Sequence, residues 1–282
     1  MSDQFSRNRL PLIIGHRGAS AIAPENTLTA FSRALSDGAD GIEFDVRLAR
    51  DDTAVVIHDA VLGRTALRSG EVAKLSFDEL KRVDVGTWFN LRYPSKACAE
   101  YSRATIPALQ EVFESFGKSG ALFYVEMKYE PQDSYKALAR QVAQLVSDYS
   151  LTNRVVVESF ALESIAEIKR LNPLIRTAAL FERTLSHPAL SLRRIVAQAV
   201  RCGANELALH RTFPLQRAAQ EAAQHNLKTI VWTVDTPAWV SRAARCGIHA
   251  LITNDPARLC AERARILDAL NPTTSMSKAD LL

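Results

Sequence analysis

Two carboxylates stand two residues apart, as Glu43 and Asp45, in an otherwise apolar segment of residues 41–46. Because successive side chains of a strand face opposite sides, both acids would share one face while their apolar neighbours share the other. Negative charges that converge in a protein interior require a compensating partner. Oxygen ligands favour a divalent cation such as Mg²⁺ or Ca²⁺ over zinc. Acids facing solvent on an edge strand are the alternative interpretation.

A third carboxylate follows the same pattern at the end of the apolar run that begins at residue 121. Glu126 and Lys128 alternate with apolar residues and would share a strand face. Three carboxylates, a water and two substrate oxygens could complete an oxygen shell around a cation. Alternatively, Glu126 and Lys128 form only a local ion pair on the surface of a strand.

Two histidines end apolar runs and are candidate proton carriers. His16 stands beside Arg17, between two glycines, and an arginine fork can bind two phosphate oxygens. His58 is followed by Asp59, which could orient the imidazole ring or simply cap a turn. By itself, a single His-Arg pair is weak evidence for a phosphate-binding or catalytic site. The role of His210, which ends a strand, is left open. The remaining histidines are predicted to be structural: His187, His225 and His249.

Eight short apolar runs, separated mostly by stretches with helical spacing, predict strands that alternate with helices. Alternation of this kind favours parallel strands in a (β/α)8 TIM barrel, with an open doubly wound sheet as the alternative. No GxGxxG or Walker sequence follows the first run, which argues against nucleotide binding. The predicted strands are residues 12–15, 41–48, 121–127, 154–160, 177–181, 206–209, 229–234 and 250–253.

One interval interrupts the alternation and is predicted to be a small insertion after the second strand, at about residues 60–105. It would lie over one mouth of the barrel, either covering the site and contacting substrate or forming an inert loop. We expect one domain over residues 10–265, because a single barrel commonly reaches this size. Residues 266–282 are expected to form a flexible tail.

The composition leaves the partner open but excludes some classes. The net charge of +4 is spread over 35 Lys and Arg residues without a dense basic block, so nucleic acid is not expected as a partner. Neither a signal peptide nor a run of about 20 apolar residues is present, so a cytoplasmic protein without a transmembrane segment is expected. The four cysteines lack metal-site or disulfide spacing and are interpreted as reduced thiols.

Five motifs, taken in order, resemble the signature of the glycerophosphodiester phosphodiesterase family. They are His16-Arg17-Gly18, Pro24-Glu25-Asn26-Thr27, Glu43-Phe44-Asp45-Val46, His58-Asp59 and Glu126-Met127-Lys128. The resemblance runs from about residue 13 to residue 256. It implies a TIM barrel with a bound divalent cation that hydrolyses glycerophosphodiesters, small-molecule substrates, to glycerol 3-phosphate and an alcohol.

The resemblance also implies a role for each matching residue. Glu43, Asp45 and Glu126 would bind the metal, and His16 and His58 would act as acid and base. Arg17, Lys128 and Trp232 would contact substrate, with Trp232 lining the pocket from the seventh strand. Glu25 and Asn26 would hold the metal- and substrate-binding residues in place without contacting the substrate themselves. The sequence departs from the family pattern at Asn254, a position often occupied by Asp, which puts a role for this residue in doubt.

Two other functions remain open beside the main one. A lysophospholipase D-like activity would require an exposed apolar ridge on the insertion, where Trp88, Phe89, Leu91 and Tyr93 cluster, although these side chains could equally be buried support. A noncatalytic phosphodiester-binding protein would be expected to lack His16 or His58, and both are present. The sequence leaves open the alcohol group, the choice between Mg²⁺ and Ca²⁺, the nucleophile (water or the glycerol 2-hydroxyl) and the oligomeric state.

Overall fold

The structure is a computed structural model that describes residues 10–130, 134–182 and 191–270. His187 and residues 271–282 of the expected tail lie outside this part of the chain.

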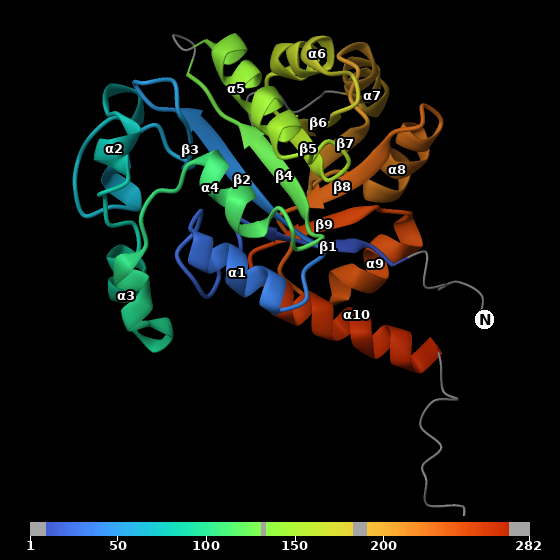
Figure 1. Cartoon of the computed structure of the whole chain (residues 1–282). Helices are drawn as coiled ribbons and strands as arrows, with labels where there is room; N and C mark the ends of the chain where they lie inside the picture. The colour runs from blue at the N-terminus through green and yellow to red at the C-terminus, as the bar shows by residue number, and fades with distance from the viewer. Residues whose placement is uncertain (1–9, 131–133, 183–190, 271–282) are drawn as a thin grey trace, which may run out of the picture.

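A closed barrel of eight parallel strands organises the described residues (Figure 1). Its strands are β1 (Leu12–His16), β2 (Gly41–Leu48), β4 (Leu122–Met127), β5 (Val155–Ser159), β6 (Arg176–Phe181), β7 (Glu206–His210), β8 (Lys228–Trp232) and β9 (Ala250–Thr253). Strand β1 pairs in parallel with both β2 and β9, which closes the sheet on itself. The prediction of a (β/α)8 barrel is therefore confirmed, and the open doubly wound sheet is wrong.

Both faces of each barrel strand are buried, which explains why the sequence shows nearly continuous apolar runs. On β4, Phe123 and Val125 face outward, and the Phe123 ring lies 5.6 Å from Phe113 of α4 (Leu109–Phe116). Tyr124 faces inward and packs with Val156 and Ile230 in the centre of the barrel. The alternation that sends Tyr124 inward also sends Glu126 inward, so the candidate carboxylate sits on a strand whose neighbouring residues are packed on both faces.

The barrel helices follow their strands and pack apolar stripes against the outer face. Helix α1 (Leu28–Ser36) begins after Thr27, whose hydroxyl accepts a hydrogen bond from the Ala30 amide. The other helices around the barrel are α5 (Tyr135–Asp148), α6 (Leu162–Leu171), α7 (Leu192–Arg201), α8 (Leu215–Ala223), α9 (Ala238–Cys246) and α10 (Pro256–Leu270). Helix α10 ends five residues beyond residue 265, so the tail predicted from residue 266 begins too early. No described helix is both long and apolar enough to cross a bilayer.

The insertion forms a lobe beside α1 and α4, at the left of Figure 1. A short strand, β3 (Ala54–Val56), first turns back antiparallel to β2, an element that the sequence analysis did not predict as a strand. Short helices then follow, with their own small core around Leu62 and Leu80. They are η2 (Leu62–Arg64), η3 (Val72–Lys74), α2 (Phe77–Leu80), α3 (Thr87–Arg92), η4 (Pro94–Lys96) and η5 (Ala99–Arg103).

Candidate active site

The polar residues singled out in the sequence meet at the carboxyl ends of the first barrel strands. Pairing of neighbouring strands aligns His16 with Glu43 and Asp45 with Glu126. These ends surround a cavity of about 260 Å³. One wall carries the predicted polar residues His16, Arg17, Glu43, His58, Glu126 and Lys128, and the other carries Glu158, Phe160, Leu180, Glu182, Trp232 and Ile252. Reactive groups in a TIM barrel are expected at this end.

Three buried carboxylates converge closely enough to hold one metal ion. Glu43, Asp45 and Glu126 each offer an oxygen, and the three oxygens lie within 4.8 Å of one another. Burial, followed by the charges of Asp45 and Glu126, raises the pKa of Glu43 well above its usual value. Burial likewise raises the pKa of Glu126 to about 7. Carboxylates that oppose one another's ionisation in this way fit a divalent cation, which would remove the repulsion.

Asp45 is the charged centre of the site. Burial alone would raise its pKa, but Arg17 and Lys128 outweigh burial and hold the pKa below its usual range. Arg17 Nε lies 3.1 Å from one Asp45 oxygen, and Lys128 Nζ lies 3.3 Å from the other. Lys128 also donates to Glu126 at 2.7 Å. The site therefore combines acceptors for a cation with two cationic side chains that suit a phosphate.

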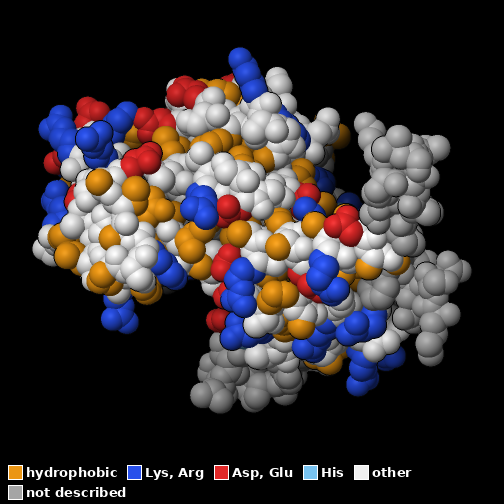
Figure 2. All heavy atoms as spheres, turned by 90° about the horizontal axis from the view of Figure 1, so that it is seen from below, with side chains coloured by type: hydrophobic (Ala, Val, Ile, Leu, Met, Phe, Trp, Pro, Cys, Tyr) orange, Lys and Arg blue, Asp and Glu red, His pale blue; other side chains and the backbone are white. Residues whose placement is uncertain are grey.

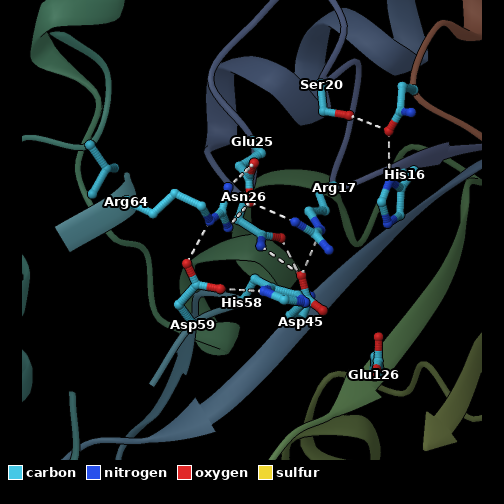
Figure 3. Close-up of polar contacts among 12 residues, drawn as sticks. His16, Arg17, Ser20, Glu25, Asn26, Asp45, His58, Asp59, Arg64 and Glu126 are labelled. Carbon is cyan, nitrogen blue, oxygen red and sulfur yellow. Dashed lines mark hydrogen bonds and ion pairs between the residues drawn. The ribbon is translucent and has the colours of Figure 1, made fainter. Parts of the chain in front are cut away.

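His16 is held by a chain of hydrogen bonds that ends at Asp235. Its Nδ1 lies 2.6 Å from Asn254 Oδ1, and Asn254 Nδ2 donates to Asp235 at 2.9 Å. Because the amide oxygen also accepts from Ser20, it acts as an acceptor toward both partners, so Nδ1 of His16 carries the hydrogen (Figure 3). The other ring nitrogen, Nε2, lies 3.9 Å from Glu43. Burial, and secondarily Arg17, lowers the pKa of His16 to about 4, which leaves its imidazole neutral at pH 7.

His58 is fixed by a second chain, which runs through the insertion (Figure 3). Its Nδ1 lies 2.5 Å from Asp59 Oδ1, and Arg64 Nε donates to the other Asp59 oxygen at 2.5 Å. The terminal nitrogens of Arg64 donate to Glu25 at 2.8 and 2.7 Å, and Glu25 accepts from Arg17 at 2.8 Å. Burial lowers the pKa of His58. Both histidines therefore have Nδ1 engaged and Nε2 left for proton exchange.

The loop after β1 positions Asn26 and Arg17 around Asp45. Asn26 Nδ2 donates to Asp45 Oδ2 at 2.8 Å, and the backbone amide of Arg17 donates to Glu43 at 3.0 Å. Gly18 has a φ of 81°, and a Cβ there would lie 2.5 Å from the Ala30 backbone, so this turn requires glycine. The His-Arg-Gly sequence thus allows the loop to fold back onto helix α1 and still present Arg17 to the carboxylates.

The opposite wall of the cavity is aromatic. Trp232 lies there, as expected from the sequence, with its ring 5.6 Å from Phe160 and 5.1 Å from His210. His210 ends β7, is not among the residues that line the cavity, and contacts the ring of Trp232, which is. His225 is exposed, and His249 lies outside the barrel interior beside Thr229. These two histidines are distant from the cavity lining.

The sequence analysis did not assign a role to several residues of the site, among them Glu158, Arg64 and Asn254. Glu158 lies inside the predicted fourth strand, where alternation with Val156 would have placed it inward. Arg64 offered no signal, because its partners Glu25 and Asp59 come from two different loops. Asn254 had been doubted as a departure from a common Asp, yet its oxygen accepts from His16. An amide in this position orients the ring without adding a charge.

Comparison with known proteins agrees with this arrangement. Residues 16–258 match the glycerophosphoryl diester phosphodiesterase family. A glycerophosphodiester phosphodiesterase from Caldanaerobacter subterraneus subsp. tengcongensis is 31% identical over 88% of this chain and 96% of its own length. One from Bacillus subtilis is 32% identical over 87% of this chain and 84% of its own length.

A solved structure shares the fold. The phosphodiesterase from Oleispira antarctica, solved in complex with the product sn-glycerol-3-phosphate, matches with a TM-score of 0.78 and 24% identity. The match covers 90% of this chain and 96% of that chain. The family match over most of the chain, together with relatives above 30% identity, shows that this protein belongs to the glycerophosphoryl diester phosphodiesterase family.

Proposed function

We propose that this protein hydrolyses glycerophosphodiesters to sn-glycerol 3-phosphate and an alcohol with the help of a divalent cation. The observation that carries the proposal is the single cavity lined by two oriented histidines, two cationic side chains and carboxylates of the acidic triad. Relatives at 31% and 32% identity bear the name of this activity. The parts needed to bind and split a phosphate diester are thus gathered at one place.

The cation would be held by Glu43, Asp45 and Glu126, whose ligand atoms are all carboxylate oxygens. Hard oxygen donors favour Mg²⁺ or Ca²⁺. A bound ion supplies charge stabilisation to phosphoryl oxygens. On this proposal the chain's own contribution is to keep Asp45 ionised, through Arg17 and Lys128, so that the site stays negative enough to bind the ion.

The two histidines would move protons through their Nε2 atoms, because Nδ1 is engaged by Asn254 in His16 and by Asp59 in His58. One would remove a proton from the nucleophile, water or the glycerol 2-hydroxyl, and the other would protonate the leaving oxygen. Arg17 and Lys128 would bind the phosphate, since each keeps further N–H donors beyond its ion pair with Asp45. Trp232 would pack against the organic part of the substrate from the aromatic wall.

The test is release of sn-glycerol 3-phosphate from glycerophosphocholine, glycerophosphoethanolamine and lysophosphatidylcholine. The enzyme is first stripped with EDTA and then supplied with Mg²⁺, Ca²⁺ or Mn²⁺. We expect metal-restored release from the two water-soluble diesters. Trapping a cyclic glycerophosphate during turnover would identify the 2-hydroxyl as nucleophile. No release of sn-glycerol 3-phosphate from any of the three substrates would contradict the proposal and favour a phosphodiester-binding protein.

A second candidate, hydrolysis of lysophospholipids, is favoured by apolar side chains exposed on the insertion. Leu67, Leu91 and Tyr93 are 62%, 66% and 40% exposed and line one groove with Arg64, a residue of the His58 chain. Figure 2 shows orange side chains among charged ones on the left-hand lobe. Phe89, by contrast, is fully buried and supports the lobe from within.

The variant Leu91→Ser tests this second candidate. If the groove binds an acyl chain, the variant should raise KM for lysophosphatidylcholine and leave KM for glycerophosphocholine unchanged. Leu174→Ser, at a leucine of the barrel that is 76% exposed, is the matched control. Equal kinetics of Leu91→Ser and Leu174→Ser on the lysolipid would exclude a role of the groove.

A further inference from the structure

A fourth carboxylate, Glu158, lies in the cavity without a partner. It is 1% exposed on β5, and strand pairing places it beside Glu126 of β4. Its side chain lines the cavity, yet its Oε2 has no hydrogen-bond partner among the described residues. A buried carboxylate oxygen without a donor is costly, so this atom is expected to meet a ligand.

Another buried glutamate of the barrel interior provides a contrast. Glu206, on β7, is equally buried, but Tyr124 donates to it at 3.1 Å and Arg176 lies 3.5 Å away. The fold therefore supplies a hydrogen-bond donor and a positive charge to Glu206, a buried carboxylate with only a structural role. Glu158 receives no such partner from the described chain, and it faces the cavity that Glu43 and Glu126 also line.

The charges at this end of the barrel point to the kind of ligand. Among the described residues that line the cavity or belong to the carboxylate triad, the acids Glu43, Asp45, Glu126, Glu158 and Glu182 outnumber the basic side chains Arg17 and Lys128. An excess of carboxylates suits a divalent cation.

Direct ligation by Glu158 is less consistent with the geometry than contact through a bound group. The oxygens of Glu43, Asp45 and Glu126 lie within 4.8 Å of one another, and Glu158 is not part of this compact set. Divalent cations, Mg²⁺ above all, keep bound waters or hydroxyls, and nearby carboxylates accept hydrogen bonds from them.

We propose that Glu158 accepts a hydrogen bond from an O–H group bound to the cation of the carboxylate triad. This inference rests on the proposed function, because it presupposes the ion. The O–H group is either a water or a hydroxyl of the glycerol moiety. In both cases Glu158 is a positioning residue, which orients a group on the ion and strengthens its binding through charge.

The test is calorimetric titration of the EDTA-stripped protein with Mg²⁺ and with Ca²⁺, followed by titration of the metal-loaded protein with sn-glycerol 3-phosphate. Glu158→Gln retains the shape and removes the charge, and Glu158→Asp retains the charge and shortens its reach. The matched control is Glu206→Gln, which changes a buried carboxylate that neither lines the cavity nor belongs to the triad. Melting temperatures of all variants are measured with and without metal.

If Glu158 binds a metal-bound water, Glu158→Gln should weaken metal affinity about 10- to 100-fold, the usual effect of losing such a partner. If Glu158 binds a substrate hydroxyl, Glu158→Gln should bind metal as tightly as the wild type, and its affinity for sn-glycerol 3-phosphate should fall instead. In either case the metal-free variant should melt no lower than the wild type, because no described residue donates a hydrogen bond to Oε2 of Glu158 that the substitution could remove. Glu206→Gln should melt lower and bind both ligands normally.

Two results would overturn the inference, and they differ in what they say of the proposed function. Wild-type protein that binds metal, with Glu158→Gln and Glu158→Asp binding both metal and sn-glycerol 3-phosphate equally well, would contradict the role of Glu158 alone. Wild-type protein that binds neither ion would contradict the metal-dependent function and the role of Glu158 with it.

Discussion

Arg64 Nε lies 2.5 Å from Oδ2 of Asp59, the residue whose other oxygen contacts His58. Arg64 belongs to the insertion, and its terminal nitrogens reach Glu25 on the loop after β1. One guanidinium thus connects the loop that carries Arg17 to the loop that carries His58. Through Arg64 the insertion therefore contributes to the orientation of the site.

Arg64→Ala should lower kcat about 10- to 100-fold, the range found when a partner that orients an active group is lost. The physical reason is that Asp59 and Glu25 would both lose a charged donor, so His58 and Arg17 would be less well held. Arg64→Lys should restore only part of the activity, because an ammonium cannot make the forked contact. Steady-state kinetics at saturating metal measure both effects.

Arg68→Ala is the matched control for Arg64, because Arg68 lies four residues away on the same segment and donates to the backbone oxygen of Ser69. It should leave kcat and KM unchanged. Arg64 is 44% exposed, so the fold should tolerate its loss. Wild-type kcat in Arg64→Ala would show that Asp59 orients His58 without help.

His16→Ala and His58→Ala should each reduce kcat by a factor of about 10² to 10⁴, the usual contribution of a positioned acid or base. Both variants should bind metal normally, because neither imidazole belongs to the carboxylate triad. Circular dichroism and metal titration establish that fold and site are intact, and His225→Ala at an exposed position serves as control. Near-normal turnover in both active-site variants would eliminate the acid-base mechanism.

Asp45→Asn should abolish or strongly weaken metal binding, because it removes the carboxylate that Arg17 and Lys128 keep ionised. Isothermal titration with Mg²⁺ and Ca²⁺ measures the effect. Glu71→Gln, which changes an acid of the insertion whose side chain is 53% exposed, should leave the affinity as it is. Unchanged affinity in Asp45→Asn would contradict the assignment of the triad.

The fold was largely predictable because the barrel strands bury both faces. Such strands read as apolar runs, and all eight predicted runs overlap strands of the barrel. The short strand β3 was missed because only three residues pair there, too few for a clear pattern. The tail was predicted to begin at residue 266, although α10 continues to Leu270 and its Ile266 is buried. The local sequence pattern thus located the barrel strands but not the residues at which the elements end.

The site was predictable where alternation along one strand decides it. Glu43 and Asp45 share a face of β2 for this reason, and β4 adds Glu126 at the same level. Contacts between distant loops were not predictable in this way. Arg64 and Glu25 are 39 residues apart, and His16 and Asn254 are 238 apart. Such pairs depend on closure of the barrel and on the path of the insertion, which no local pattern specifies.

His249 should contribute a loss of stability as the pH decreases from about 6.5 to about 4. Burial, followed by the charges of Lys228 and Arg176, lowers the pKa of His249 from its usual value of 6.5 to about 4. Below pH 6.5 the unfolded chain therefore binds a proton that the folded chain does not, which favours unfolding. The stabilisation is complete above pH 6.5 and is lost progressively down to pH 4.

Denaturant titrations at several pH values measure this slope. His249→Gln should show a shallower loss of unfolding free energy between pH 6.5 and 4 than the wild type, whatever its stability at pH 7. His225→Gln, at an exposed histidine, should follow the wild-type slope. The pKa of His16, also lowered to about 4, adds the same trend to every variant that retains it, so only the difference between slopes reports on His249. Parallel slopes for His249→Gln and wild type would mean that His249 titrates alike in the folded and unfolded chains, and that its burial imposes no penalty on the charged ring.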